Sequence, residues 1–126
     1  MKKILGTLAL LALAAATFAA DTKSAAKSQK VEGYLVDVAC GTDTAESSKP
    51  GFGAKHSKHC LQMPECEESG YAVLTSDNKV VKFDKASNEQ AKAFIANTNR
   101  ERDWKVAVNG TMNPDNTLKV DSIALQ

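Results

Sequence analysis

The sequence predicts an all-β domain that carries a single helix. Five segments are rich in β-branched residues or alternate apolar with polar residues, which is typical of strands; they are 31–39, 71–75, 80–83, 104–112 and 118–125. One segment, 87–100, instead repeats its apolar residues at offsets of three and four, which is typical of a helix packed on a core. A long insertion, 40–69, separates the first two strands. Five strands with a helix between the third and the fourth is the element order of an OB-fold, so we expect a five-stranded, OB-like Greek-key barrel.

The first 20 residues are interpreted as a signal peptide. Lys2 and Lys3 precede an apolar run, and the run ends in small residues suited to cleavage near Ala19 or Ala20. The run is shorter than the roughly 20 residues that cross a membrane, so no membrane span is expected in the mature form. The protein should therefore be periplasmic or extracellular. Residues 21–30 are small and polar, and they predict a flexible leader before a domain at 31–126.

The strands and the helix are predicted from local patterns. Segments 71–75 and 80–83 flank Ser-Asp-Asn-Lys, and 104–112 and 118–125 flank Asn-Pro-Asp-Asn. Both linkers have the residues of tight turns, so each pair of strands should form a hairpin. Ser87 followed by Gln90 resembles a capping box and predicts that the helix begins at Ser87. Trp104, at the start of the fourth strand, is expected in the core rather than on a ligand-binding face.

Three stretches also carry a resemblance to a protein family: GYLVDVACG, HCLQMPECEESGYAVLTSDNKVVKFD and WKVAVNGTMNPDNTLKVDSIAL. They resemble a family of small secreted bacterial proteins in which a strand with a glycine-aromatic pair ends in a cysteine. In that family a histidine and two further cysteines follow, and a Met-Pro-x-Cys step leads into Ser-Gly-Tyr. The similarity covers most of the chain from Val31 onward. It implies a secreted OB-like barrel with a Cys/His insertion, and it implies no particular reaction.

The insertion gathers soft metal ligands. If residues 54–63 form one short helix that Pro64 stops, three potential ligands fall on one face of it, at i, i+4 and i+7. The candidate metal ligands of the whole insertion are Cys40, His56, His59, Cys60, Met63 and Cys66. Three cysteines with one histidine suffice for a tetrahedral zinc site, whereas a set with methionine and fewer thiolates suits copper. The sequence therefore predicts a site for copper or zinc.

The same cysteines could instead brace the insertion. Cys40 ends the first strand and Cys66 precedes the second, so both should return to one rim of the barrel. A disulfide that closes a loop of this length stabilises an exported domain by about 3 kcal/mol. With three cysteines one thiol is left over, and the residues do not choose the pairing, although Cys40 with Cys66 or with Cys60 is favoured over Cys60 with Cys66.

Several functional classes are not expected. The 16 basic and 15 acidic residues nearly balance, and loss of Lys2 and Lys3 keeps the mature chain close to neutrality, so neither nucleic acid nor an anionic membrane is favoured as a partner. Cys60 beside His59 could be a reactive thiol, but no acidic residue is obviously placed to orient the histidine, and we predict no enzyme. The alternative function is an OB-like module that binds a small ligand or a partner protein, with purely structural cysteines.

Overall fold

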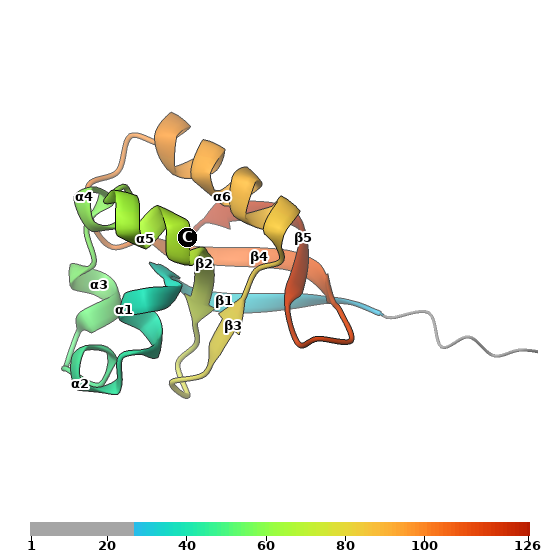
Figure 1. The fold of residues 1–126 in the computed structure, drawn as a ribbon, viewed down its shortest axis with the longest axis horizontal. Coiled ribbons are helices and arrows are strands. Elements are labelled where there is room, and N and C mark those ends of the chain that lie inside the picture. Colours follow the sequence, from blue (N-terminus) through green and yellow to red (C-terminus); the bar gives the residue numbers. More distant parts are fainter. Residues whose placement is uncertain (1–26) are drawn as a thin grey trace, which may run out of the picture.

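The protein is described as a computed structural model that covers residues 27–126, and the predicted signal peptide lies outside these residues. Its strands form one five-stranded antiparallel sheet in the order β3-β2-β1-β4-β5. The strands are β1 (Ser28–Asp37), β2 (Tyr71–Leu74), β3 (Val80–Lys82), β4 (Lys105–Met112) and β5 (Leu118–Leu125). The helices are α1 (Val38–Thr42), α2 (Thr44–Ser47), α3 (Phe52–Lys55), α4 (Lys58–Leu61), α5 (Pro64–Ser69) and α6 (Lys85–Asn97), as Figure 1 shows.

The two predicted hairpins are confirmed. β2 pairs with β3, and β4 pairs with β5, each in antiparallel register. The central strand β1 joins the hairpins, since it pairs with β2 on one side and with β4 on the other. β1 begins at Ser28 rather than at Val31, because residues 28–30 pair with β4 across from Thr111 to Asn109. The part of the predicted leader that forms these pairs therefore belongs to the sheet.

The predicted closure of the sheet into a barrel is wrong. The edge strands β3 and β5 meet only at one isolated bridge, between Phe83 and Leu118, where the Asp84 backbone N–H also donates to the Leu118 carbonyl at 3.0 Å. β3 is only three residues long, and Asp84 caps α6 directly after it. The chain thus turns into the helix before it can run along β5, and the sheet stays open.

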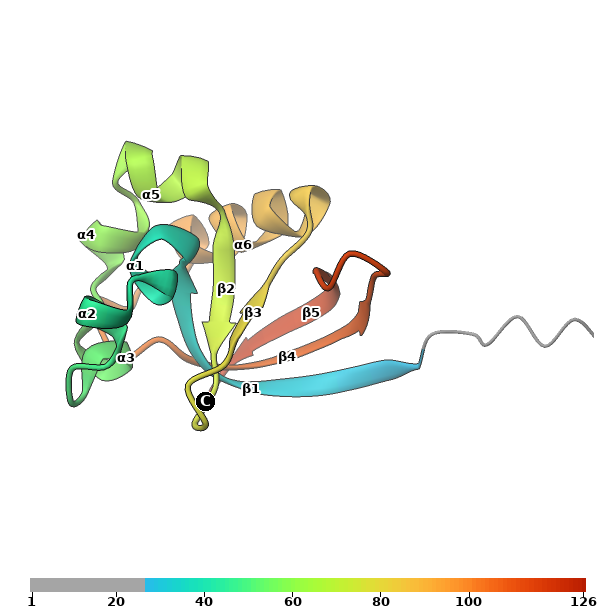
Figure 2. The same ribbon diagram turned by 60° about the horizontal axis from the view of Figure 1, so that its bottom comes forward.

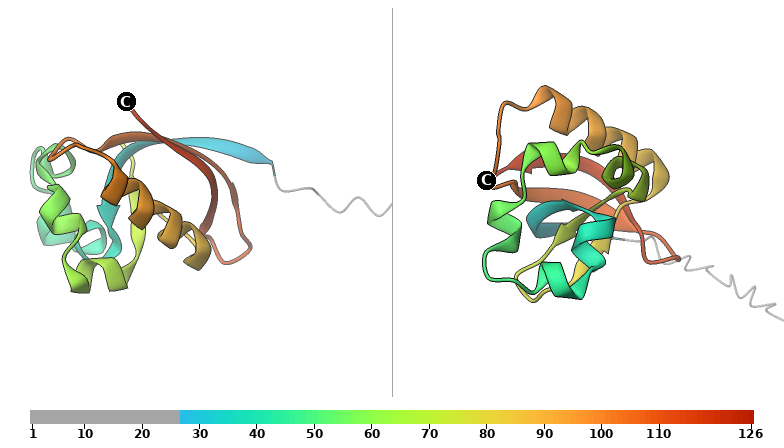
Figure 3. Two further views of the ribbon diagram at one scale, coloured as in Figure 1. Left: turned by 90° about the horizontal axis from the view of Figure 1, so that it is seen from above. Right: turned by 60° about the vertical axis from the view of Figure 1, so that its left-hand side comes forward.

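Helix α6 covers one face of the sheet, and the insertion gathers at one end of it (Figures 2 and 3). The predicted helix start is wrong by one turn, because Asp84 is the N-cap and accepts from the Ser87 backbone N–H at 2.9 Å. Ser87 is instead buried, and its hydroxyl oxygen accepts from the Val120 backbone N–H at 2.8 Å. This contact ties α6 to β5.

Two apolar clusters lie on opposite faces of β1 and β2. The larger one, between the sheet and α6, contains Leu35, Tyr71, Ile95 and Trp104; Trp104 is fully buried, as predicted. The smaller one contains Val36, Ala72 and Leu74, with Tyr34 and Phe52 packed against it. Because neighbouring residues of a strand point to opposite faces, Leu35 and Val36 enter different clusters. The insertion therefore covers the second face only at its own end of the sheet, over β1 and β2.

The insertion contains five short helices, whereas the sequence predicted one helix there at most and one helix in the barrel. Side-chain caps account for three of these short helices: Asp37 caps α1, Asp43 caps α2 and Ser57 caps α4, whereas α3 and α5 have no side-chain cap. A cap supplies an acceptor to N–H groups that a short helix cannot satisfy internally. The helix predicted over 54–63 is wrong, because His56 is extended (φ −61°, ψ 121°) and separates α3 from α4. Within residues 27–126, we find no helix long and apolar enough to cross a membrane.

Candidate metal centre

Asp37 is the residue around which the base of the insertion is organised. It ends β1 and is fully buried. One carboxylate oxygen, Oδ1, accepts from the Cys40 backbone N–H at 2.9 Å, which caps α1. The other, Oδ2, lies 2.8 Å from His56 Nε2. The capping geometry and the imidazole together fix both oxygens of a carboxylate that has no access to water.

His56 reaches Asp37 because the chain breaks between α3 and α4. The backbone of His56 is extended, and its ring is buried inside the insertion, next to the end of β1. The Phe52 ring flanks it at a centroid distance of 5.2 Å. His56 is thus held by packing on one side and by a hydrogen bond on the other, and Asp37 fixes its orientation.

Two thiols complete the cluster. Cys40 lies in α1 and Cys66 lies in α5, and one ligand atom each from Asp37, Cys40 and Cys66 lies within 4.8 Å of the other two. Two hydrogen bonds hold α1 and α5 together: Val38 N–H donates to the Gly70 carbonyl at 2.9 Å, and Ala39 N–H donates to the Ser69 hydroxyl at 3.1 Å. The two ends of the insertion therefore meet, as the sequence predicted.

When no cation is bound, only Asp37 among the three groups of the cluster is favoured in its ionised form. Burial opposes ionisation of Asp37, but hydrogen bonds from His56 and from the Cys40 backbone outweigh it and lower the pKa of this carboxyl. Burial, and next the negative charge of Asp37, raise the pKa of the Cys40 thiol to about 12 and also raise the pKa of Cys66. Both thiols are therefore protonated at neutral pH and are poor nucleophiles.

The structure brings together only part of the predicted ligand set. Cys40 and Cys66 lie in the cluster, and His56 joins it through Asp37. Cys60 lies outside the cluster, where its sulfur accepts from the Ser57 hydroxyl at 3.2 Å. His59 and Met63 are exposed. None of the three cysteines is in a disulfide.

Asp37 is absent from the ligand set predicted from the sequence, where no acidic residue was expected to orient a histidine; Asp37 in fact orients His56. A signal was present: Asp37 stands at the end of an apolar strand, three residues before Cys40, at the spacing of an N-cap residue and the N–H that it accepts from. Its contact with His56 spans 19 positions of the chain, which no local pattern reveals.

A small hollow adjoins the centre. His56 and Cys60 both line a cavity of about 220 Å³ that opens to solvent between α2, α3 and α4. No hydrogen bond joins the His56 ring to a thiol within the part of the chain that the structure describes. The Asp37–His56 pair therefore orients an imidazole without a nucleophile bonded to it.

Comparisons of the chain with family models, with curated proteins and with solved structures gave no match.

Proposed function

We propose that this is an exported, non-catalytic binding protein whose insertion holds a transition metal between Asp37, Cys40 and Cys66. The observation that carries the proposal is the approach of the three ligand atoms to within 4.8 Å of one another. In a tetrahedral zinc site with bonds of 2.0 to 2.3 Å, neighbouring ligand atoms lie about 3.6 Å apart. A small contraction of the cluster would therefore suffice.

The donor set favours zinc over copper. Thiolates bind both Cu(I) and Zn(II), but a carboxylate oxygen suits a harder ion, and zinc accepts both kinds of ligand. A dication would also reverse the electrostatics of the cluster, because it favours the thiolates that Asp37 disfavours. His56 would then support the site from outside, by holding the ligating carboxylate in place.

Metal titration of the reduced protein tests the proposal. Zn(II) and Cu(I) are added anaerobically to the purified protein, and bound metal is measured by mass spectrometry and by competition with a chelator. We expect one zinc per chain, lost in Cys40→Ser and in Cys66→Ser. Cys60→Ser is the matched control, since Cys60 belongs to the same insertion but lies outside the cluster. The absence of stoichiometric metal, or an equal loss in Cys60→Ser, would refute the site.

The approach of Cys40 and Cys66 also supports a second function for the same thiols. We propose that Cys40 and Cys66 form a disulfide in an oxidising compartment. This bond would link the two ends of the insertion and would exclude the metal. Alkylation under non-reducing conditions followed by peptide mass spectrometry distinguishes the two states. If the disulfide forms, alkylation should label one thiol, that of Cys60. If the cluster instead holds a metal, alkylation of the unfolded protein should label all three thiols.

We propose further that the domain is an OB-like module opened between β3 and β5. The neighbours of each strand in the order β3-β2-β1-β4-β5, and the helix between β3 and β4, support this assignment. The single bridge between Phe83 and Leu118 lies where such a barrel would close. An experimental structure that pairs β5 with a strand other than β4 or β3 would contradict it.

A further inference from the structure

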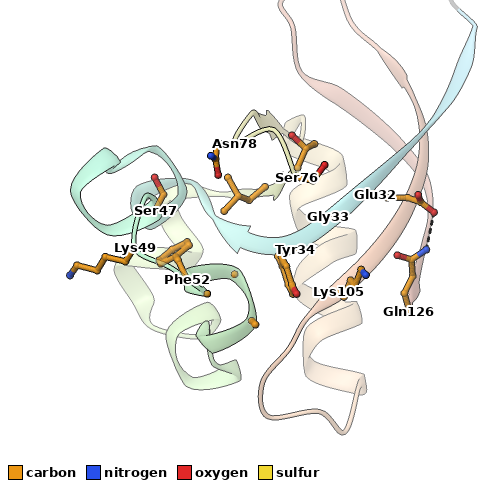
Figure 4. Close-up of a pocket in the computed structure, with 15 residues that line it drawn as sticks. Glu32, Gly33, Tyr34, Ser47, Lys49, Phe52, Ser76, Asn78, Lys105 and Gln126 are labelled. Atoms are coloured by element: carbon orange, nitrogen blue, oxygen red, sulfur yellow. Dashed lines mark hydrogen bonds between the residues drawn. The ribbon is translucent and has the colours of Figure 1, made fainter.

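A sizeable hollow on the described surface lies apart from the metal centre. It has a volume of about 660 Å³ and opens between β1, the insertion, the turn from β2 to β3, the start of β4 at Lys105 and the C-terminal residue Gln126 (Figure 4). Pockets of 300 to 1,000 Å³ are typical for small-molecule ligands. Five separate segments of the chain therefore build a cavity of the size that a small ligand requires.

Tyr34 and Phe52 supply its aromatic walls, and packing holds both rings in place. Both pack against the apolar cluster of Val36 and Leu74, Tyr34 from β1 and Phe52 from α3 in the insertion. Gly53 lets α3 approach β1, since a Cβ there would lie 2.4 Å from the Tyr34 ring. The shape of the cavity thus depends on a close contact between the insertion and the sheet, rather than on mobile surface side chains.

Polar groups without a partner line the same cavity. Tyr34 and Lys105 are opposite each other in the β1–β4 ladder, so their side chains lie on one face as neighbours. Within residues 27–126, no hydrogen bond or ion pair engages the Tyr34 hydroxyl, the Lys105 ammonium, the Ser47 hydroxyl or the Asn78 amide. The carboxylate of Glu32 is occupied, by Lys30 at 2.6 Å and by Gln126 at 2.8 Å. The charge of Lys105 also acts on the nearby Glu32 carboxylate, but no direct ion pair joins the two. The cavity therefore offers an ammonium with free hydrogen-bond donors beside hydroxyl and amide groups.

We propose that this cavity binds a small sugar acid, with its carboxylate at Lys105 and Tyr34 and its ring against the aromatic walls. An ammonium and a phenol hydroxyl both donate to a carboxylate. The C–H face of a sugar ring packs on an aromatic ring, and its hydroxyl groups match Ser47 and Asn78, which both donate and accept. A neutral sugar would leave Lys105 without a partner. The proposal is independent of the metal centre, because the two sites share no residue.

Binding of D-glucuronate and of D-glucose, followed by NMR of the ¹⁵N-labelled protein, tests this inference. We expect saturable shifts for glucuronate that cluster at Tyr34, Phe52 and Asn78, with glucose binding about tenfold more weakly, because a charge-assisted hydrogen bond contributes this much. Lys105→Met should lower the affinity for glucuronate about tenfold and leave that for glucose unchanged. Lys119→Met, which removes an exposed lysine outside the cavity, is the matched control and should bind as the parent does.

Acetate separates a sugar-acid site from a general carboxylate site. If acetate binds as tightly as glucuronate, the aromatic walls contribute nothing and the ligand class is wrong. Saturation by neither sugar, or equal affinity for glucuronate in the parent and in Lys105→Met, would overturn the site itself. Retention of glucuronate binding in Cys40→Ser would show that this site stands even if the metal centre fails, and loss of binding in that folded variant would contradict the independence of the two sites.

Discussion

Replacement of His56 by alanine should destabilise the fold strongly. Nε2 of His56 lies 2.8 Å from Asp37 Oδ2, and the two side chains are 4% and 0% exposed. Because both side chains are buried, the small contributions to stability that are typical of surface ion pairs do not apply to this pair. Removal of one partner from a buried pair costs about 3 to 5 kcal/mol, because the other is left without its donor. We expect the lower end, about 3 kcal/mol, since the Cys40 backbone N–H still donates to Asp37.

Urea unfolding followed by circular dichroism measures this loss. In a separate thermal unfolding experiment on a domain of about 100 residues, a loss of 3 kcal/mol corresponds to a fall of about 15 °C in Tm. His59→Ala is the matched control, because His59 is exposed on α4, and it should change the free energy of unfolding by less than about 0.5 kcal/mol. The loss in His56→Ala should shrink when Asp37 is already asparagine, since no buried charge then remains. If His56→Ala unfolds within about 1 kcal/mol of the parent, the Asp37–His56 pair does not hold the insertion.

Two further predictions concern the frame around the sites. Asp84→Asn should make stability less sensitive to acid: the hydrogen bond with Ser87, foremost, lowers the pKa of Asp84 below its usual 3.8, so its contribution is present above that pH and is lost as pH falls through the folded pKa. Asparagine caps a helix as well as aspartate does, so unfolding at about pH 6 and about pH 3 should show a smaller difference in the variant, and parallel pH curves would contradict this assignment. Gly53→Ala should cost about 1 to 3 kcal/mol in thermal unfolding, because the new methyl group would meet the Tyr34 ring at 2.4 Å. Gly51→Ala, where the backbone has φ +73° but the nearest side chain is 3.6 Å away, tests strain without this clash and should leave the Tyr34 environment unchanged by NMR.

The sheet could be predicted from the sequence because its determinants are local. Alternation identified the strands, and the turn residues after β2 and after β4 identified the hairpins. Helix α6 followed from its 3.6-residue period, although the cap was assigned to Ser87 instead of Asp84. Closure of the barrel is different, since it depends on whether β3 and β5 meet over several residues. Nothing in either strand specifies that, and here Asp84 turns the chain away.

The insertion could be predicted only in part, for a related reason. Its composition pointed to a site, and the return of Cys40 and Cys66 to one place followed from the pairing of β1 with β2. The local structure depended instead on capping of single turns, which breaks the expected helix at His56. The burial of Asp37 is a tertiary property, because residues far along the chain, His56 and Cys66, pack against it.

Asp37 has a structural role and a proposed ligand role, and Cys40 allows the two to be separated. The cap on α1 uses the backbone N–H of Cys40, which serine also possesses, whereas the proposed ligand is the Cys40 sulfur. Cys40→Ser therefore removes the thiolate ligand and leaves the capping hydrogen bond in place. His56→Ala does the reverse, since it removes the support of Asp37 and keeps all three proposed ligands. A metal site thus predicts loss of metal in the reduced, apo-stable Cys40→Ser protein, and weaker metal binding with lower apo stability in His56→Ala. A purely structural cluster predicts no stoichiometric metal in the parent or in either variant.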